Sequence, residues 1–484
     1  MEHEAFRDSP QRRDNLLRAL RWLQSSGVEY VYMQFPSITG RLQGKGIPAR
    51  HFARMAEKGF SMVYGATVNV ALDRFGNYLG YPPNASELLA YPEPETLVQL
   101  PWDKRVARVF CALFRNPADP TSPGQRLDAD CRGNLRAQHQ AFEARHGLRL
   151  RAGMEPEMMW LRQQAGEPRY VGVTEPRCYH IGQFETLRPV YMKVLEYAHA
   201  MGLDMIQGDH EDAPGQLELN FAFDDVLASC DRLMTYRQIC HQVAREFDLV
   251  ACFLPKPFAG VSGSGCHFNL SLWDGGHAVL REEVFARTQG MEEVYSHYEG
   301  GTNLFLPAAG DPGLTDVGKF AIGGIQRHLN ALTAIAAPTV NSYKRLWETG
   351  FWAPVRANWG YQNRTCAIRV SAPDRVEYRT ADAIVNPYLM ASALLAAIDD
   401  GLANRVEPGP ATDGDSYGEH PAPTAYVPRN LGQALEALDH DPVVSAALPG
   451  DMKGLFQAIK TNEWQSFLAT VTQWDFDTYL DHTP

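Results

Sequence analysis

Four short segments of this sequence place carboxylate, imidazole or guanidinium side chains at alternate positions. They read GMEPEMMW, QLELNFAF, CHFNLSLW and RVEYRT, and apolar residues fill most of the positions between. Because side chains two residues apart lie on one face of a β-strand, we predict four strands that each have an apolar and a reactive face. Contact with water would explain any one polar face equally well. Four together, with Glu-x-Glu and His-x-Asn-x-Ser instead of the Lys and Thr of a solvated face, indicate a polar cavity.

The reactive faces carry ligands for hard cations. Mg²⁺ and Mn²⁺ prefer carboxylate oxygen, and clustered carboxylates repel one another unless cations neutralise them. A single histidine in such a strand would more simply be a hydrogen-bonded core residue, so the prediction depends on the whole set. The predicted metal ligands are Glu155, Glu157, Glu211, Glu218, His267 and Glu377.

Arginines gather in the same part of the chain. A guanidinium binds phosphate or carboxylate through two parallel hydrogen bonds, which lysine cannot do. Each arginine by itself would be a surface residue, but arginines and metal ligands at one site suggest phosphoryl transfer. The chain has neither a GxxxxGK[ST] loop nor a strand-GxGxxG-helix pattern, so another architecture must hold the nucleotide. The arginines are Arg345, Arg364, Arg369, Arg375 and Arg379.

The surrounding sequence predicts the elements that position these residues. Leucines at helical spacing predict a helix over residues 11 to 26, ended by Gly27, and a β-branched and aromatic run predicts a strand over 28 to 35. The Pro-rich stretch 115 to 126 suits a domain boundary. Helices are predicted over 228 to 247 and from Asn386-Pro387 to Gly401. The fold class is therefore α+β, with a mostly antiparallel sheet in the second domain.

Composition excludes several classes of function. The 484 residues carry a net charge of -12, which disfavours nucleic acid and anionic membranes as partners. The N-terminal residues lack a secretory signal, and no apolar run is long enough to cross a membrane. Eight scattered cysteines with no CxxC pair indicate reduced thiols in a cytoplasmic protein.

The chemistry-bearing segments resemble glutamine synthetases. The stretches GMEPEM, GDHEDAPGQLELNF, PKPFAGVSGSGCHFNLSL, NSYKRL, NRTCAIRV and RVEYRTADAIVNPYLMASALL follow the family's order over nearly the whole chain after residue 150. The resemblance implies an N-terminal β-grasp domain with a leading helix over residues 1–116 and a guanido-kinase-like catalytic domain over 124–484. It also implies L-glutamate and ATP as substrates, two Mg²⁺ or Mn²⁺ ions per site, and a homo-oligomer of stacked rings with active sites between neighbouring subunits.

Carried over position by position, the resemblance assigns a role to each residue. The implied ligands of one metal are Glu157, Glu211 and Glu218, and those of the other are Glu155, His267 and Glu377. The substrate glutamate would be bound by Gly263, Arg345 and Arg379. The transferring phosphate would be bound by Arg364 and Arg369, and the nucleotide by Phe223, Ser271 and Arg375. Phe223 is the least certain of these, because strict alternation places it on the apolar face.

Two departures from the family change the expected acceptor. Ammonia-using members carry an aspartate and a glutamate where this chain reads MVYGAT and GFWAP, so Tyr64 and Trp352 replace both acids, with Phe351 nearby. The second histidine of the family's His-x-His is Asn269, and the first residue of its Asn-Gly-Ser-Gly loop is Ser262. Losing two anions removes the attraction for ammonium and the obvious base, whereas aromatic rings form an apolar or cation–π surface.

We therefore predict an ATP-dependent ligase that joins the glutamate γ-carboxylate to an organic amine. The favoured subclass is an aromatic or apolar amine such as aniline, which is already neutral at pH 7. One alternative is a glutamine synthetase that takes ammonium through Glu348 or Asp73. A non-catalytic family member and a plain metal-binding protein are the others, and the retained ligands and arginines argue against both. Tyr417 lies near the family's adenylylation position, although its polar surroundings predict an exposed loop tyrosine.

Overall fold

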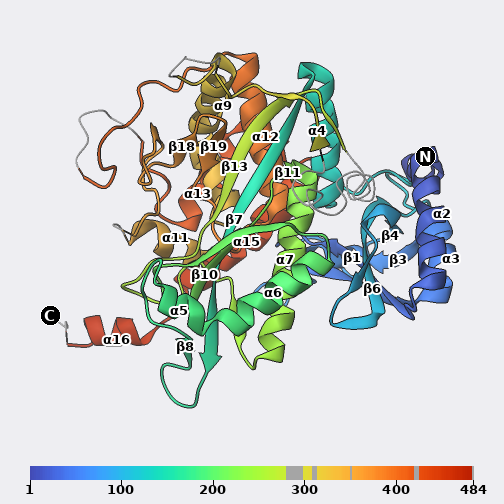
Figure 1. Ribbon diagram of the computed structural model, residues 1–484, viewed down its shortest axis with the longest axis horizontal. Coiled ribbons are helices and arrows are strands. Elements are labelled where there is room, and N and C mark those ends of the chain that lie inside the picture. Colours follow the sequence, from blue (N-terminus) through green and yellow to red (C-terminus); the bar gives the residue numbers. More distant parts are fainter. Residues whose placement is uncertain (279–297, 308–312, 349–350, 419–424, 482–484) are drawn as a thin grey trace.

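The structure is a computed structural model that describes residues 1–278, 298–307, 313–348, 351–418 and 425–481 (Figure 1). Two sheets that share no strand dominate the fold. No helix among the described residues is long and apolar enough to cross a membrane. Mixed helices and sheets agree with the predicted α+β class.

The N-terminal part contains the predicted helix and strand. Helix α2 covers Pro10–Ser25, and Gly27 follows it with a positive φ of 73°. Strand β1 covers Tyr30–Pro36. A helix that the sequence did not predict, α1, precedes them over Glu2–Asp8.

One sheet is built from this N-terminal part in the order β2-β1-β6-β4-β3, with β5 paired to β6. Strand β1 runs parallel to β6 and antiparallel to β2. The remaining strands are β2 (Leu42–Pro48), β3 (Phe60–Val63), β4 (Glu87–Pro92), β5 (Val98–Leu100) and β6 (Asp103–Arg115). The short helices are η1 (Ala49–His51), α3 (Phe52–Lys58), η2 (Tyr64–Val68) and η3 (Pro94–Thr96). The β-grasp assignment and the division between residues 116 and 124 stay predictions.

The second sheet has the order β17-β18-β19-β13-β7-β10-β9 and is antiparallel except for the β17–β18 pair. All four predicted reactive segments are neighbouring strands of it. Its strands are β7 (Leu148–Gln163), β9 (Met205–His210), β10 (Gln216–Phe221), β13 (Cys266–Asp274), β17 (Trp359–Tyr361), β18 (Ile368–Ala372) and β19 (Arg375–Tyr378). Four short strands extend β7 or β13, namely β8 (Tyr170–Gly172), β11 (Asp224–Asp225), β12 (Val250–Cys252) and β16 (Thr302–Asn303). A separate hairpin joins β14 (His277–Ala278) to β15 (Tyr298–Glu299).

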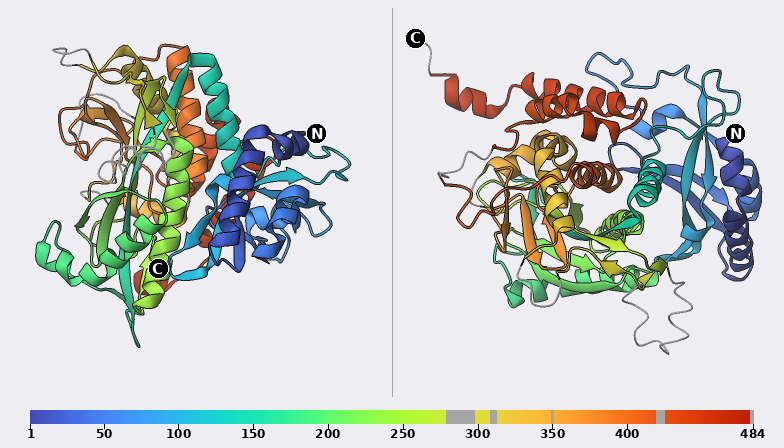
Figure 2. Two further views of the ribbon diagram at one scale, coloured as in Figure 1. Left: turned by 45° about the vertical axis from the view of Figure 1, so that its right-hand side comes forward. Right: turned by 90° about the horizontal axis from the view of Figure 1, so that it is seen from above.

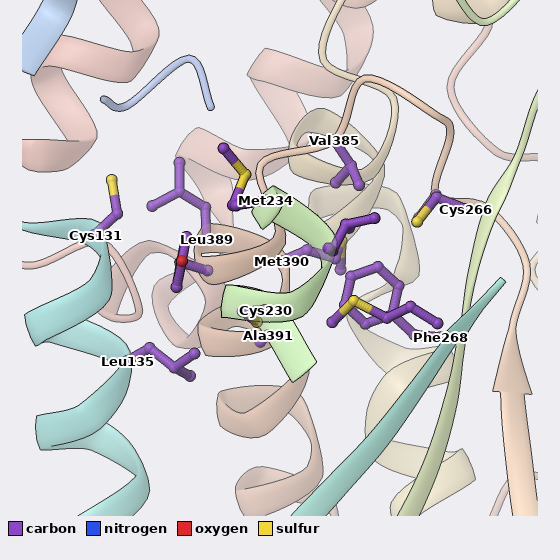
Figure 3. Packing of buried hydrophobic residues seen from close by; sticks show 14 of the residues in the cluster. Cys131, Leu135, Cys230, Met234, Cys266, Phe268, Val385, Leu389, Met390 and Ala391 are labelled. Atoms are coloured by element: carbon purple, nitrogen blue, oxygen red, sulfur yellow. The ribbon is translucent and has the colours of Figure 1, made fainter. Parts of the chain in front are cut away.

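Helices α4 (Cys131–His146), α7 (Val226–Glu246) and α12 (Pro387–Ala403) lie between the two sheets (Figure 2). The apolar faces of β13 and these helices meet in one core that includes Phe268, Met234 and Leu389 (Figure 3). The reactive faces of the strands therefore point to the other side of the large sheet. The remaining helices are α5 (Ile181–Thr186), α6 (Arg188–Ala200), α9 (Asp316–Arg327), α10 (Leu329–Ala336), α11 (Val340–Trp347), α13 (Leu431–His440), α14 (Pro442–Ala446), α15 (Met452–Leu468) and α16 (Gln473–Tyr479).

Helix α12 confirms its predicted start but not its predicted end. The Asn386 side chain accepts hydrogen bonds from the backbone N–H groups of Tyr388 and Leu389. The helix continues through Gly401 to Ala403, so the prediction that Gly401 terminates it is wrong. Gly401 instead permits close packing against α9, because a Cβ there would lie 2.1 Å from the carbonyl oxygen of Phe320.

His328 supplies a pH-dependent contact between helices. Burial opposes its charge, but hydrogen bonds to Asp441 and Asp400, at 2.7 and 3.1 Å, raise the pKa of the ring. A raised pKa stabilises the fold below the unfolded value of about 6.5, and this contribution fades as pH rises through the folded value. We expect His328→Gln to lose roughly 1 to 3 kcal/mol of unfolding free energy at pH 5.5 and clearly less at pH 9, measured by urea unfolding. Equal losses at both pH values would contradict this.

Candidate active site

The strand registers bring the predicted ligands side by side. His267 on β13 lies opposite Glu155 on β7, and Glu218 on β10 lies opposite Glu157 on β7. Glu377 on β19 lies opposite Asn269 of β13. Paired residues of adjacent antiparallel strands have close side chains, so the sheet gathers these groups on one face.

Glu155, His267 and Glu377 form the tightest cluster, with one ligand atom from each within 4.8 Å of the others. His267 Nδ1 lies 3.3 Å from a Glu155 oxygen and 3.4 Å from a Glu377 oxygen. Burial, followed by the neighbouring Arg379 guanidinium, lowers the pKa of His267 well below its usual value. A neutral imidazole between two carboxylates is a competent ligand set for Mg²⁺ or Mn²⁺.

A second group of carboxylates lies beside the first. Burial and neighbouring carboxylates raise the pKa of Glu211 to about 8 and that of Glu218 well above its usual value. Burial also raises the pKa of Glu157, although its Oε2 accepts hydrogen bonds from the Gly265 N–H and the Gln216 amide. A cation beside these carboxylates would oppose both burial and repulsion, because it stabilises their charged forms. The role of Glu157, Glu211 and Glu218 as ligands of a second metal stays a prediction.

Bound cation should therefore stabilise the fold. We expect millimolar Mn²⁺ or Mg²⁺ to raise the unfolding temperature and EDTA to reverse the rise, because a ligand at 100 times its Kd adds about 2.7 kcal/mol. Differential scanning fluorimetry measures this change in unfolding temperature. Glu155→Gln should shrink the rise, while Glu196→Gln, a surface change beside Lys193, should keep it. An equal rise in both variants would place the cation elsewhere.

Four arginines surround the carboxylates. Arg369 donates to Glu377 Oε2 at 2.9 Å, and Arg379 donates to Glu377 Oε1. Arg345 is buried and donates to the carbonyl oxygens of Thr380 and Arg379. Arg364 is exposed and lies near enough to Glu211 to lower its pKa. The structure thus brings together all four arginines predicted to bind glutamate and the transferring phosphate.

The glycines just before β13 allow the arginines and the predicted metal ligands to lie this close together. A Cβ on Gly263 would lie 2.8 Å from the Cγ of Arg345, and one on Gly265 would lie 2.8 Å from the Nε2 of His267. Gly263 therefore lies at the predicted glutamate end of the site. A larger residue would clash with Pro255 and Arg345 at the first position, and with Arg345 and His267 at the second.

The predicted nucleotide residues lie near one another around β13. Phe223 is 48% exposed, so the alternation that placed it in the core fails beyond Phe221, where β10 ends after a register shift. Its ring is stacked 6.3 Å from that of Trp273. Ser271 Oγ accepts a hydrogen bond from the Trp273 indole. Arg375 is exposed and donates to the Ser371 hydroxyl.

The segment over residues 351–354, where ammonia-using family members carry a glutamate, presents Trp352. Its side chain is 54% exposed, and its backbone adopts a φ of 65°, a conformation that costs a bulky residue energy. Arg379 donates to the Trp352 carbonyl at 3.3 Å, which ties the segment to the carboxylate cluster. The ammonium of Lys256 lies 4.7 Å from the centre of the Phe351 ring. Glu348 pairs with Lys256 at 2.5 Å and accepts from a backbone N–H.

Tyr64 is not brought to this site within one chain. It is 3% exposed in the core of the N-terminal part, and its hydroxyl donates to Asp119 at 2.9 Å. Its place in an amine pocket stays a prediction and requires a neighbouring subunit. Asp73, an alternative ammonium ligand, accepts hydrogen bonds from Phe75 and Asn77 of its own loop.

Three residues near the site were not predicted. Tyr417 is only partly exposed, contrary to expectation, and burial raises its pKa to about 12 beside Arg379 and Arg345. Asp209 faces Glu218 across β9 and β10, and its position two residues before Glu211 was a signal in the sequence. Trp273 continues the alternation of β13 beyond Ser271. No local pattern marked Tyr417.

Comparison with known proteins agrees with this geometry. Residues 128–301 and 286–479 match the family described as "Glutamine synthetase, catalytic domain". The chain is 31% identical over 470 residues to a glutamine synthetase of Rhizobium leguminosarum bv. phaseoli, covering 95% of this chain and 98% of the relative. It is 31% identical over 478 residues to the glutamate–methylamine ligase of Methyloversatilis universalis, covering 96% and 98%. The solved structure "GmaS/ADP complex-Conformation 1" matches at a TM-score of 0.81 and 30% identity, covering 96% of this chain and 99% of that one.

Proposed function

The chain belongs to the glutamine synthetase family of carbon–nitrogen ligases, and on that premise we propose that it joins the glutamate γ-carboxylate to an organic amine. The observation that carries the ligase chemistry is the cluster of Glu155, His267 and Glu377 beneath Arg369 and Arg379. Two observations favour an organic amine. Trp352 is exposed, and the Glu348 carboxylate is already paired with Lys256.

The proposed reaction has two balanced steps. A γ-carboxylate oxygen of glutamate attacks the γ-phosphorus of ATP, and ADP leaves. The amine nitrogen then attacks the carbonyl carbon of the γ-glutamyl phosphate, phosphate leaves with the C–O bonding electrons, and the amine proton passes to solvent. Divalent cations would neutralise the phosphates. We propose two per site, one on Glu157, Glu211 and Glu218 and one on Glu155, His267 and Glu377.

The arginines have different proposed roles according to their positions. Arg345 and Arg379, with Gly263 close to Arg345, would bind glutamate at the buried end. Arg364 and Arg369 would stabilise the charge that develops on the transferring phosphoryl group. Phe223 would stack on the adenine of ATP, with Ser271 and Arg375 beside it. Preorganised groups of this kind act by position, without movement during the reaction.

Ammonia requires a site that attracts a cation and removes its proton. The two acids considered for that role are engaged elsewhere, Glu348 with Lys256 and Asp73 within its own loop. Trp352 and Phe351 offer apolar surface instead, which suits an amine carrying an aryl or alkyl group. A weakly basic aromatic amine is neutral at pH 7 and needs no base to free its lone pair. Aromatic amines are therefore our favoured subclass.

The deciding experiment measures phosphate release from ATP that depends on both glutamate and amine. Ammonia, methylamine, longer alkylamines and aniline are compared at equal concentration with Mg²⁺ and with Mn²⁺. We expect organic amines to exceed ammonia in kcat/KM. Best turnover with ammonia would make this a glutamine synthetase, and no turnover with any amine would support a non-catalytic role.

Changing Trp352 should shift the choice of acceptor. We expect Trp352→Glu to raise kcat/KM for ammonia relative to the organic amine by about tenfold, because a carboxylate there attracts ammonium. Trp352→Gln supplies similar volume without charge and is the matched control. If the glutamate variant behaves like the glutamine variant, a charge at this position does not determine the acceptor.

We also propose the assembly and the compartment. The family resemblance supports stacked rings with active sites between subunits. All eight cysteines are free thiols, and seven are buried, which suits the reducing cytoplasm.

A further inference from the structure

Two adjoining cavities lie where the N-terminal hairpin meets the catalytic part of the chain. One has a volume of about 790 Å³ and the other about 560 Å³. They share Gly40 and Arg41, next to the β1–β2 hairpin, and Arg237 and His241 on α7. Figure 1 shows α7 between the large sheet and the N-terminal sheet. Neither cavity is lined by a residue of the candidate active site.

The smaller cavity is strongly basic. Among the described residues no aspartate or glutamate lines it, although the whole chain has a net charge of -12. Burial, followed by the positive charges of Arg245 and Arg237, lowers the pKa of His241. Within the described part of the chain, none of its cationic side chains forms an ion pair with a carboxylate. These side chains are Arg41, Lys45, Arg237 and Arg245.

Polar atoms in the smaller cavity lack partners. Arg237 is 9% exposed, and its guanidinium donates to the Ala383 carbonyl at 2.8 Å and contacts the Met234 sulfur, while its Nε has no acceptor. The amide nitrogen of Gln34, which is 6% exposed, and the amide oxygen of Gln238 are also unpaired. No described carboxylate forms an ion pair with Arg237, although the nearby Asp382 favours its charged form. A buried guanidinium whose Nε lacks an acceptor is costly, so its position in the cavity wall points to an anionic ligand.

The larger cavity supplies an apolar extension. Its wall includes Leu161, Phe253, Ile335 and Phe456. Its one carboxylate, Glu463, is occupied by Lys460 at 2.9 Å and by the Val340 N–H at 3.0 Å. A ligand that fills both cavities must therefore carry a negative group at one end and a hydrophobic body at the other.

We propose that this pair of cavities is a binding site for a small organic carboxylate, with its carboxylate on Arg237 and Arg41 and its hydrocarbon part among the apolar residues. The unpaired Nε of Arg237 and the exposed Arg41 supply donors for a carboxylate, and the apolar wall selects against inorganic anions. The site is separate from the proposed ligase chemistry, so it stands whichever amine the enzyme uses.

The test measures binding by isothermal titration calorimetry to the full-length protein in its native assembly. The probes are 3-phenylpropanoate and hexanoate, with 3-phenylpropanamide as the uncharged match and inorganic phosphate as the inorganic anion. We expect at least one carboxylate to bind and the amide and phosphate to bind at least about tenfold more weakly. Binding of phosphate without the carboxylates, or of the amide as tightly, would overturn the proposal.

Two variants locate the binding. Arg237→Gln should weaken carboxylate binding by about tenfold or more. Arg41→Ala should weaken it severalfold, and because the exposed Arg41 side chain makes no described contact, that variant should fold normally. Arg54→Ala, another exposed arginine without a described partner, is the control and should bind like the wild type. Unchanged affinity in both cavity variants would overturn the assignment.

Discussion

Glu218→Gln is expected to lower kcat by about 1,000-fold, because the carboxylate that we propose as a metal ligand becomes a neutral amide at the point of phosphoryl transfer. Glu218 projects from β10 opposite Glu157, and its described hydrogen bond is to the Asn220 amide at 2.7 Å. Glutamine has nearly the same shape, so packing is retained while the charge is lost. The measurement is the glutamate-, amine- and ATP-dependent release of phosphate with Mg²⁺ and Mn²⁺.

Two comparisons keep this prediction specific. Glu196→Gln removes a carboxylate that pairs with Lys193 on the surface, and it should retain wild-type turnover. Without metal, the unfolding temperature of Glu218→Gln should equal or exceed that of the wild type, since the remaining buried carboxylates repel one another less. Turnover within a few-fold of wild type would remove Glu218 from the metal site.

Arg364→Gln is expected to lower kcat by about 100- to 1,000-fold with a smaller change in KM. The exposed guanidinium makes no described hydrogen bond, and the Glu211 pKa records its charge nearby. We propose that Arg364 stabilises the charge that develops during phosphoryl transfer, so its loss should lower kcat more than it weakens ground-state binding. Steady-state kinetics at varied concentrations of ATP and glutamate measure kcat and KM separately.

Arg54→Gln is the matched control for that experiment. Arg54 is also exposed and without a described partner, but it lies on α3 in the N-terminal part. Its variant should keep wild-type kcat. Arg364→Lys should recover only part of the loss, because an ammonium supplies charge without the guanidinium fork. A large rise in KM for glutamate with unchanged kcat would assign Arg364 to substrate binding instead.

The sequence by itself determined which side chains share a face. Alternation placed Glu155 with Glu157, His267 with Asn269, and Glu218 with Asn220, and all three segments are strands. Asn386-Pro387 likewise determined the start of α12, because a cap depends on the few residues that follow it. Such features are local, and the period of the backbone alone specifies them.

Only the tertiary structure decided which strands are neighbours and in what register. Those long-range pairings bring His267 to Glu155 and Glu377, and they expose Phe223 where β10 ends. They also bury Tyr64 and place Gly401 inside α12 against α9.

Tyr417 and Arg237, whose Nε has no acceptor, belong to the same category, since the surroundings of each come from residues far away in the chain. A residue type and its spacing determine the direction of a side chain. Its partners and its exposure to water depend on packing between distant segments, which no local pattern encodes.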